Sequence, residues 1–305
     1  SFDRESLDAL ASKAEVIITT VGPYAKYGAE IVAACVRNGT DYCDLTGESP
    51  FIRAMIDAHQ EEAEKTGARI VCSCGFDSIP SDLGTLMMQE AFKERHGRYA
   101  SQVKLAAGKM SGGPSGGTIA SMTNIIDELK ANPSLRKILG DPYALNPKGV
   151  RGPDRGDQNG VRYDKDFGLW TGPFLMAGIN TRVVRRSHAL LGSPWGNDFR
   201  YSEVMSTGKG PKGWARAATC AGSIGALLAG LAFDPTRRLI EKRLPSPGEG
   251  PSQEARDNGF FTVRFGALGD GNVVRGLVAD QRDPGYGSTA VMLSESALCL
   301  ALEGA

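Results

Sequence analysis

Three segments of the chain place glycine or proline beside carboxylate and hydroxyl groups. They are residues 21–24 (V-G-P-Y), 44–48 (D-L-T-G-E) and 74–82 (C-G-F-D-S-I-P-S-D). Glycine lets a ligand approach the backbone closely, and acidic or hydroxyl groups can orient a substrate or move a proton. Each segment alone also fits ordinary turn chemistry, with Ser81 or Asp82 capping the helix that follows. Three such segments together favour one shared binding site.

The elements that carry these segments alternate between strand and helix. We predict strands over residues 16–21, 40–46 and 68–73, and helices before the first strand and over 28–37, 50–66 and 80–96. Short connections between them predict right-handed βαβ units and a parallel sheet. Ligands bind beyond the carboxyl ends of parallel strands, so the three segments would converge on one crevice.

Beyond Tyr99 the pattern changes to that of an α+β domain. We predict strands over 102–109, 199–206, 260–268 and 272–279, and helices over 119–130, 180–191 and 288–302. We predict a glycine-rich turn over residues 110–118 and a long, partly irregular excursion over residues 132–170.

Charge and cysteine content exclude several classes of protein. Lys and Arg number 35 and Asp and Glu number 35, so the chain lacks the cationic surplus of a general nucleic-acid binder. The six cysteines share no metal-site spacing, and only three histidines are present, so we expect no metal site. We expect these cysteines to be buried thiols in a reducing compartment, which favours the cytoplasm. Residues 1–13 form a charged, helix-like stretch without the pattern of a signal peptide.

One apolar segment stands apart. Residues 217–233 carry no charge, and over 182–243 there are eleven Lys or Arg against four Asp or Glu. Three interpretations stay open: a short membrane span, an interfacial helix with basic flanks near 214–243, and a buried helix or homodimer face.

Several motifs resemble those of the saccharopine dehydrogenase-like oxidoreductases, in particular the branch of trans-acting enoyl reductases. The motifs are T-T-V-G-P-Y, Y-C-D-L-T-G-E, C-G-F-D-S-I-P-S-D-L-G, S-G-G-T-I-A-S (interrupted by Pro114 and Ser115), L-P-S-P-G-E-G-P-S and D-P-G-Y-G-S-T-A. They occur in the order of the family and cover nearly the whole chain. The resemblance implies an NAD(P)-binding Rossmann domain and an α+β substrate domain. Mycobacterial members reduce a double bond on lipid intermediates released from polyketide synthases.

The chain departs from the family in its cofactor-binding half. The glycine-rich phosphate loop of the family, and the residue that separates NADP from NAD, have no counterpart here. We therefore expect a partial Rossmann-type sheet that lacks its first βα units, a chain truncated at both ends, and little activity from this fragment alone. The resemblance implies NADP as the cofactor, with NAD as the alternative.

The resemblance also assigns the nicotinamide side of the site. Cofactor-binding positions are Val21, Gly22, Pro23 and Tyr24 after the first strand, Asp44 and Thr46 after the second, and Gly75, Phe76 and Asp77 after the third. Enoyl reduction needs a proton donor. Tyr24 is the first candidate, with Tyr42, Asp77 and Lys109 behind it, while Asp82 is expected to cap its helix.

We divide the chain into the second half of a Rossmann domain (1–98), a substrate domain (99–280) and a helix returning to the Rossmann domain (281–305). A reductase acting on a lipid-like substrate, in peripheral contact with the inner face of the plasma membrane, is the first hypothesis. A saccharopine-type amino-acid dehydrogenase is the second; it needs arginine clamps, for which Arg182, Arg185 and Arg186 are candidates. A non-catalytic, lipid-associated family member is the third.

Overall fold

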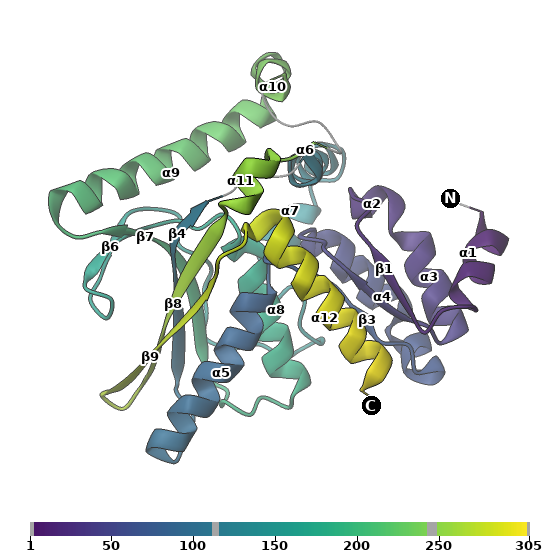
Figure 1. Ribbon diagram of the computed structural model, residues 1–305, viewed down its shortest axis with the longest axis horizontal. Coiled ribbons are helices and arrows are strands. Elements are labelled where there is room, and N and C mark those ends of the chain that lie inside the picture. The colour runs from purple at the N-terminus through teal and green to yellow at the C-terminus, as the bar shows by residue number, and fades with distance from the viewer. Residues whose placement is uncertain (1–2, 112–115, 243–248, 304–305) are drawn as a thin grey trace.

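A computed structural model describes residues 3–111, 116–242 and 249–303, which form two sheets with helices packed against both (Figure 1). The interruption of the S-G-G-T-I-A-S motif at Pro114 and Ser115, and the first residues of the L-P-S-P-G-E-G motif, lie outside these residues. The α/β class predicted from the sequence is confirmed.

The first sheet is parallel, with three strands in the order β1–β2–β3. Its elements are α1 (Arg4–Ala11), β1 (Val16–Thr19), α2 (Tyr24–Tyr27), α3 (Ala29–Asn38), β2 (Asp41–Asp44), α4 (Ser49–Thr66) and β3 (Ile70–Val71). The strands are shorter than predicted. β2 ends at Asp44 because its carboxylate accepts a hydrogen bond from the Thr46 backbone N–H and turns the chain out of the ladder.

Each face of this sheet is covered by different helices. Ile17 and Tyr42 belong to an apolar cluster with α3 and α4. Their neighbours on the opposite face, Val16 and Cys43, pack with Leu293 of α12 (Thr289–Leu302). The last helix of the chain therefore lies against its first strands, as Figure 1 shows.

The second sheet is mixed and has six strands in the order β5–β6–β7–β4–β8–β9. Their bounds are β4 (Gln102–Ser111), β5 (Arg162–Asp164), β6 (Leu169–Gly172), β7 (Arg200–Gly208), β8 (Phe260–Gly269) and β9 (Asn272–Asp280). α5 (Ile79–His96) and α8 (Ala177–Leu190) contribute to the main core of this sheet through Phe92 and Val184, which are fully buried. The predicted hairpin of β8 and β9 is confirmed, with Asn272 paired to Gly269.

The remaining elements among the described residues are five helices and one short π-helix. They are α6 (Gly116–Ala131), α7 (Leu135–Gly140), α9 (Gly210–Ala232), α10 (Asp234–Glu241), α11 (Gln253–Asp257) and the short π-helix η1 (Pro284–Ser288). Residues 132–170, predicted to be partly irregular, contain α7, β5 and the start of β6. Both strands are short, and β6 forms where β7 supplies an edge for it to join.

Candidate active site at the junction of the two sheets

A buried carboxylate, Glu48, joins the loops after β1 and β2. Its side chain accepts hydrogen bonds from the backbone N–H groups of Tyr24 and Ala25, each at 2.9 Å. Ser121 of α6 donates a third from its hydroxyl, at 2.7 Å. Glu48 was not a predicted site residue, and nothing in the neighbouring sequence indicates this role, because its partners lie between 23 and 73 positions away.

Asp44 performs a similar task between the loops after β2 and β3. Its Oδ1 accepts from the backbone N–H groups of Thr46 at 2.9 Å and Ser73 at 3.0 Å, and the Tyr42 hydroxyl donates to Oδ2 at 2.9 Å. Burial raises the pKa of the Asp44 carboxyl to about 6, although these hydrogen bonds oppose the shift. Asp44 and Thr46 are fully buried, so their side chains do not line an open cleft, contrary to the expectation from the resemblance.

Tyr24 also helps to hold the loops after β1 and β2 together. Its hydroxyl donates to the Thr19 carbonyl at 3.2 Å and accepts from the Leu45 backbone N–H at 3.3 Å. The ring is 5% exposed and packs against Phe51 with 6.1 Å between centroids. Burial raises the pKa of Tyr24, which makes it a weaker acid. The structure therefore gives Tyr24 a positioning role and not the open hydroxyl of a proton donor, and Tyr42 is fully buried behind it.

The backbone after β1 is more accessible. Val21 is exposed, and the next two residues, Gly22 and Pro23, are partly buried. A Cβ placed on Gly22 would lie 3.4 Å from the Tyr24 ring and 3.5 Å from Ser121 Oγ. These are ordinary van der Waals distances, so this loop and α6 lie close together at Gly22.

The loop after β3 is the place where both sheets and α12 meet. Gly75 lies so close to Leu45 and Thr289 that a Cβ would approach them to 2.9 and 3.1 Å. The next residue, Phe76, donates its backbone N–H to Thr289 Oγ1 at 3.0 Å and packs edge-on against Phe261, with centroids 4.7 Å apart. Gly75 and Phe76, both predicted to bind the cofactor, therefore stabilise the junction of the two sheets and α12 by packing.

Asp77 follows in the same loop and differs from the carboxylates described above. It is partly buried and forms no hydrogen bond or ion pair with any described residue. A Cβ on Gly47 would lie 3.9 Å from Asp77 Oδ2 and equally far from Ile179 of α8, so the carboxyl faces a gap that glycine leaves open. Burial raises the pKa of Asp77 to about 6. A free carboxyl that titrates near neutrality can act as an acid or base.

The sequence predictions missed a series of hydrogen bonds between buried polar side chains, which begins at the residue after Asp77. Ser78 donates its hydroxyl to Asn180 Oδ1 at 3.2 Å, and the Asn180 amide donates to Glu203 Oε2 at 2.9 Å. The Tyr201 hydroxyl donates to Glu203 Oε1 at 2.7 Å. Burial raises the pKa of Glu203 to about 7. The only sequence signal is the Tyr201-x-Glu203 spacing within β7, which places both side chains on one face of the strand.

Asp82 does not cap its helix as predicted. α5 begins after Ser78, and no side chain caps its N-terminus. Ser187 of α8 donates its hydroxyl to Asp82 Oδ2 at 2.8 Å, while Oδ1 has no partner among the described residues. Burial raises the pKa of Asp82 to about 6. Three carboxyls with raised pKa thus surround the contact of α5 with α8 and β7.

The sequence has close relatives of known family. The trans-acting enoyl reductase of Mycobacterium tuberculosis is 40% identical over 312 residues, which cover 98% of this chain and 74% of the relative. The chain belongs to the trans-acting enoyl reductase family. The Mycobacterium ulcerans member is 38% identical over 313 residues with the same coverage, and a second M. tuberculosis protein, which bears the name provisionally, is 41% identical over 310 residues.

Comparisons with family models and with solved structures provide less evidence on the family. No family model matches the chain. Among solved structures, saccharopine dehydrogenase (L-Glu forming) from Saccharomyces cerevisiae superposes with a TM-score of 0.46 at 13% identity, covering 99% of this chain and 80% of that one. An amine dehydrogenase from Mycobacterium smegmatis gives a TM-score of 0.42, also at 13% identity, with coverage of 99% and 76%. The enoyl reductase family is thus established by sequence.

The members of this family are oxidoreductases, so we tested whether the residues present fit a nicotinamide cofactor. Val21 is exposed just beyond the end of β1, where the ring of a nicotinamide cofactor would lie. No glycine-rich loop joins a strand of the first sheet to a helix N-terminus among the described residues. The ring side of the cofactor fits this enoyl reductase chain, and its phosphates have no cradle within the described part.

The remaining predicted residues lie elsewhere. Lys109 is exposed on β4, and its side chain forms no hydrogen bond to Tyr24 or Asp77. Arg182 and Arg185 of α8 are buried in ion pairs and are not free to clamp a substrate or face a membrane. Arg182 pairs with Asp157 at 3.0 Å, and Arg185 with Asp154 at 2.8 Å.

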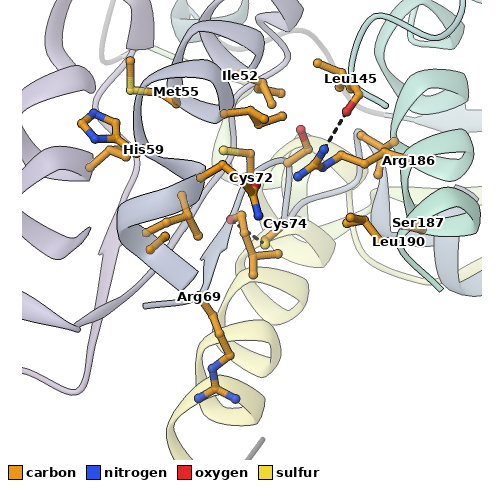
Figure 2. A pocket seen from close by; sticks show the side chains of 18 of the residues that line it. Ile52, Met55, His59, Arg69, Cys72, Cys74, Leu145, Arg186, Ser187 and Leu190 are labelled. Atoms are coloured by element: carbon orange, nitrogen blue, oxygen red, sulfur yellow. Dashed lines mark hydrogen bonds between the residues drawn. The ribbon is translucent and has the colours of Figure 1, made fainter. Parts of the chain in front are cut away.

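Arg186 of the same helix points into a separate hollow of about 500 Å³ (Figure 2). Its guanidinium donates to the Leu145 carbonyl at 2.6 Å, and burial lowers its pKa. The walls come from α4, β3 and α8, and include Ile52, Cys72 and Leu190. None of the predicted catalytic or cofactor residues lines this hollow, so it is distinct from the gap at Asp77.

Proposed function

We propose that the chain is the substrate-side part of a reductase that saturates the carbon–carbon double bond of an enoyl group on a lipid-like acyl substrate. Family membership supports the reaction class, and the structural observation that carries the site is the unpaired Asp77 carboxyl at the junction of the two sheets. The cofactor is NADPH, with NADH as the alternative. Its ring would be held by Val21, Gly22 and Pro23.

Asp77 supplies the proton of the reaction. A reduced nicotinamide, when bound, supplies a hydride to the β-carbon of the enoyl group. The electron pair of the double bond moves to the α-carbon and its carbonyl, and Asp77 then transfers the proton of its carboxyl to the α-carbon. The resulting carboxylate regains a proton from solvent, since Asp77 remains partly exposed. Glu48 and Tyr24 hold the loops in place.

The test uses a protein extended to the full length of the relatives, below called the extended protein, because the described residues lack a phosphate cradle. Turnover of NADPH with a long-chain trans-2-enoyl thioester is measured for the wild type and for Asp77→Asn. We expect the variant to lose at least about 100-fold in kcat, within the usual contribution of a general acid. Asp82→Asn, a second carboxyl with a raised pKa, is the matched control and should retain activity within about threefold.

The pH profile gives an independent readout. Asp77 has a pKa of about 6, so its acid form is lost as the pH rises. We expect kcat of the wild type to fall about tenfold per pH unit above pH 6, and the residual turnover of Asp77→Asn to be flat over the same range. A wild-type rate that rises between pH 6 and 8 would contradict the role of Asp77.

The same assays separate the other hypotheses. Oxidation of saccharopine with NADP, in place of enoyl reduction, would support the amino-acid dehydrogenase. NADPH binding without turnover of any enoyl thioester would remove the assignment to this substrate class, and the absence of NADPH binding by the extended protein would support a non-catalytic member. The 305-residue chain alone is expected to bind NADPH more weakly than the extended protein, because it offers the cofactor only its ring side.

A further inference from the structure

The apolar segment identified in the sequence forms α9, and it is not buried. By length and composition, α9 is the one helix among the described residues that could cross a membrane, yet only 11% of its most apolar window is buried. This excludes the interpretation as a buried domain helix. Figure 1 shows α9 along the outer edge of the molecule, away from the first sheet.

Both ends of α9 are held on the protein. Near its start, Gly213 and Ala217 pack on β6 and β7, and the Gly213 carbonyl accepts from Thr207 Oγ1 at 2.9 Å. At its end, the Gly230 carbonyl accepts from Thr236 of α10 at 2.7 Å. Ion pairs from α6 to α10, including Lys130 with Asp234 at 2.8 Å, hold α10 in turn. A helix fixed at both ends lies flat on the body and cannot be surrounded by lipid along its length, which disfavours a span.

On the outward side of α9 and α10, aromatic and aliphatic side chains are exposed to a degree that is unusual for a solvated surface. Trp214 is 51% exposed, Leu228 43% and Phe233 62%. No charged residue occurs between Arg216 and Asp234. An aromatic side chain at each end of an uncharged surface is typical of a helix that lies at a membrane–water interface.

Most charges around this surface are positive; Asp234, which follows Phe233, is paired with Lys130, and Arg237 is paired with Asp127. Five basic residues flank it, and none forms a salt bridge with a described residue: Lys209, Lys212, Arg216, Arg238 and Lys242. The first turn of α9 contains no acidic residue, so Lys209 and Lys212 crowd the helix end where cations are unfavourable. An external anion would relieve this repulsion, and an anionic lipid surface provides many at once.

We propose that the outer face of α9, from Trp214 to Phe233, docks flat on a bilayer that contains anionic lipid. The uncharged face enters the headgroup region, and the basic residues at its two ends contact lipid phosphates. The earlier count of basic residues over 182–243 overstates this surface, because Arg182, Arg185 and Arg186 lie inside the protein. The flanks of α9 and α10 are sufficient for the interaction.

Flotation of the extended protein with vesicles tests the proposal. We expect vesicles of equal phosphatidylcholine and phosphatidylglycerol to bind it at least tenfold more than pure phosphatidylcholine, and 0.5 M salt to remove most of this difference. Fluorescence of the exposed Trp214 should shift to the blue on binding, and Trp214→Phe should abolish the shift. Alkaline carbonate should release the bound protein, which a spanning helix would resist.

Matched variants identify the surface. Phe233→Asp and Leu228→Asp should each lower binding at least tenfold, whereas Leu277→Asp, at a leucine 57% exposed on β9, should leave it unchanged. All three positions are exposed, so thermal unfolding should shift little. Lys212→Glu with Arg216→Glu should reduce binding to anionic vesicles only.

Two outcomes would overturn the proposal. One is the absence of binding to anionic vesicles by the folded protein. The other is a concentration-dependent dimer that Phe233→Asp dissociates and anionic vesicles do not, since the face would then belong to a contact between two copies. Neither outcome depends on enoyl reduction, so the proposed function is tested separately.

Discussion

Glu48 and Asp77 follow neighbouring strands of the same sheet, and their surroundings are opposite. Glu48 is 1% exposed, and each of its oxygens accepts a hydrogen bond from a backbone N–H. Asp77 has no partner among the described residues and faces a gap beside Gly47. One carboxylate fixes the geometry of the loops, whereas the other is left free where both sheets meet.

The presence or absence of hydrogen-bond partners distinguishes a structural carboxylate from a catalytic one more clearly than the residue type does. A carboxylate that satisfies buried donors stabilises the fold, and removing it leaves those donors unpaired. A carboxyl without partners destabilises the fold when ionised, and it persists where catalysis requires it. The two residues should therefore respond oppositely to substitution.

Glu48→Ala should give the largest effect. The substitution leaves the buried N–H of Tyr24 and the N–H of Ala25 without an acceptor, so we expect a loss of about 3 kcal/mol in the free energy of unfolding. Urea denaturation measures it. Asp57→Ala, which removes a carboxylate 48% exposed and paired with Arg53, should cost less than about 0.5 kcal/mol. Equal costs for both variants would refute the structural role of Glu48.

Asp77→Asn should act in the other direction on stability while it lowers turnover. The pKa of Asp77 in the folded state is about 6, above the ordinary value of 3.8, so the folded protein binds more protons and loses stability as the pH rises through 4 to 6. Removing the charge should stabilise the protein by about 2 kcal/mol at pH 8 and by about half as much at pH 5.

The measurement is urea denaturation at the two pH values. Asp270→Asn, at a carboxylate 70% exposed, is the control and should show no such dependence on pH. A destabilising Asp77→Asn at pH 8 would mean that the carboxylate has partners that stabilise its charge.

Tyr24→Phe should give the smallest effect. It removes the hydroxyl between the Thr19 carbonyl and the Leu45 N–H, for which we expect about 1 kcal/mol of destabilisation. Turnover of the extended protein should stay within about threefold of the wild type. A loss of 100-fold with unchanged stability would return the proton-donor role to Tyr24.

The first sheet was predictable because its signals are local. Apolar runs, and helix ends at Gly39 and Gly67, where φ is +67° and +80°, specify the βα alternation within a few residues. Residues 132–170 were not predictable in the same way, since β6 depends on an edge supplied by β7. The sequence also correctly predicted that the three strands end at the same edge, because they are parallel strands of one sheet.

The roles of individual site residues depend on distant partners and escaped prediction. Asp82 lies where a cap is expected, but Ser187, 105 positions later, provides its hydrogen bond. Glu203 and Asn180 meet only because α8 packs on β7. The type of a residue and its place on a strand thus indicate where chemistry can occur, and the partners decide which residue remains available for it.

The contact of α12 with the first sheet has a consequence for how the chain matures on the ribosome. Arg69, beside β3, donates to the carbonyls of Leu300 and Glu303, and Cys43 and Cys74 pack on Leu293. One face of the first sheet stays uncovered until α12 has been synthesised. The second sheet, whose strands all lie between Gln102 and Asp280, can assemble earlier. The strands of the first sheet therefore depend on α12, and a nascent chain that stops before α12 would expose them to aggregation.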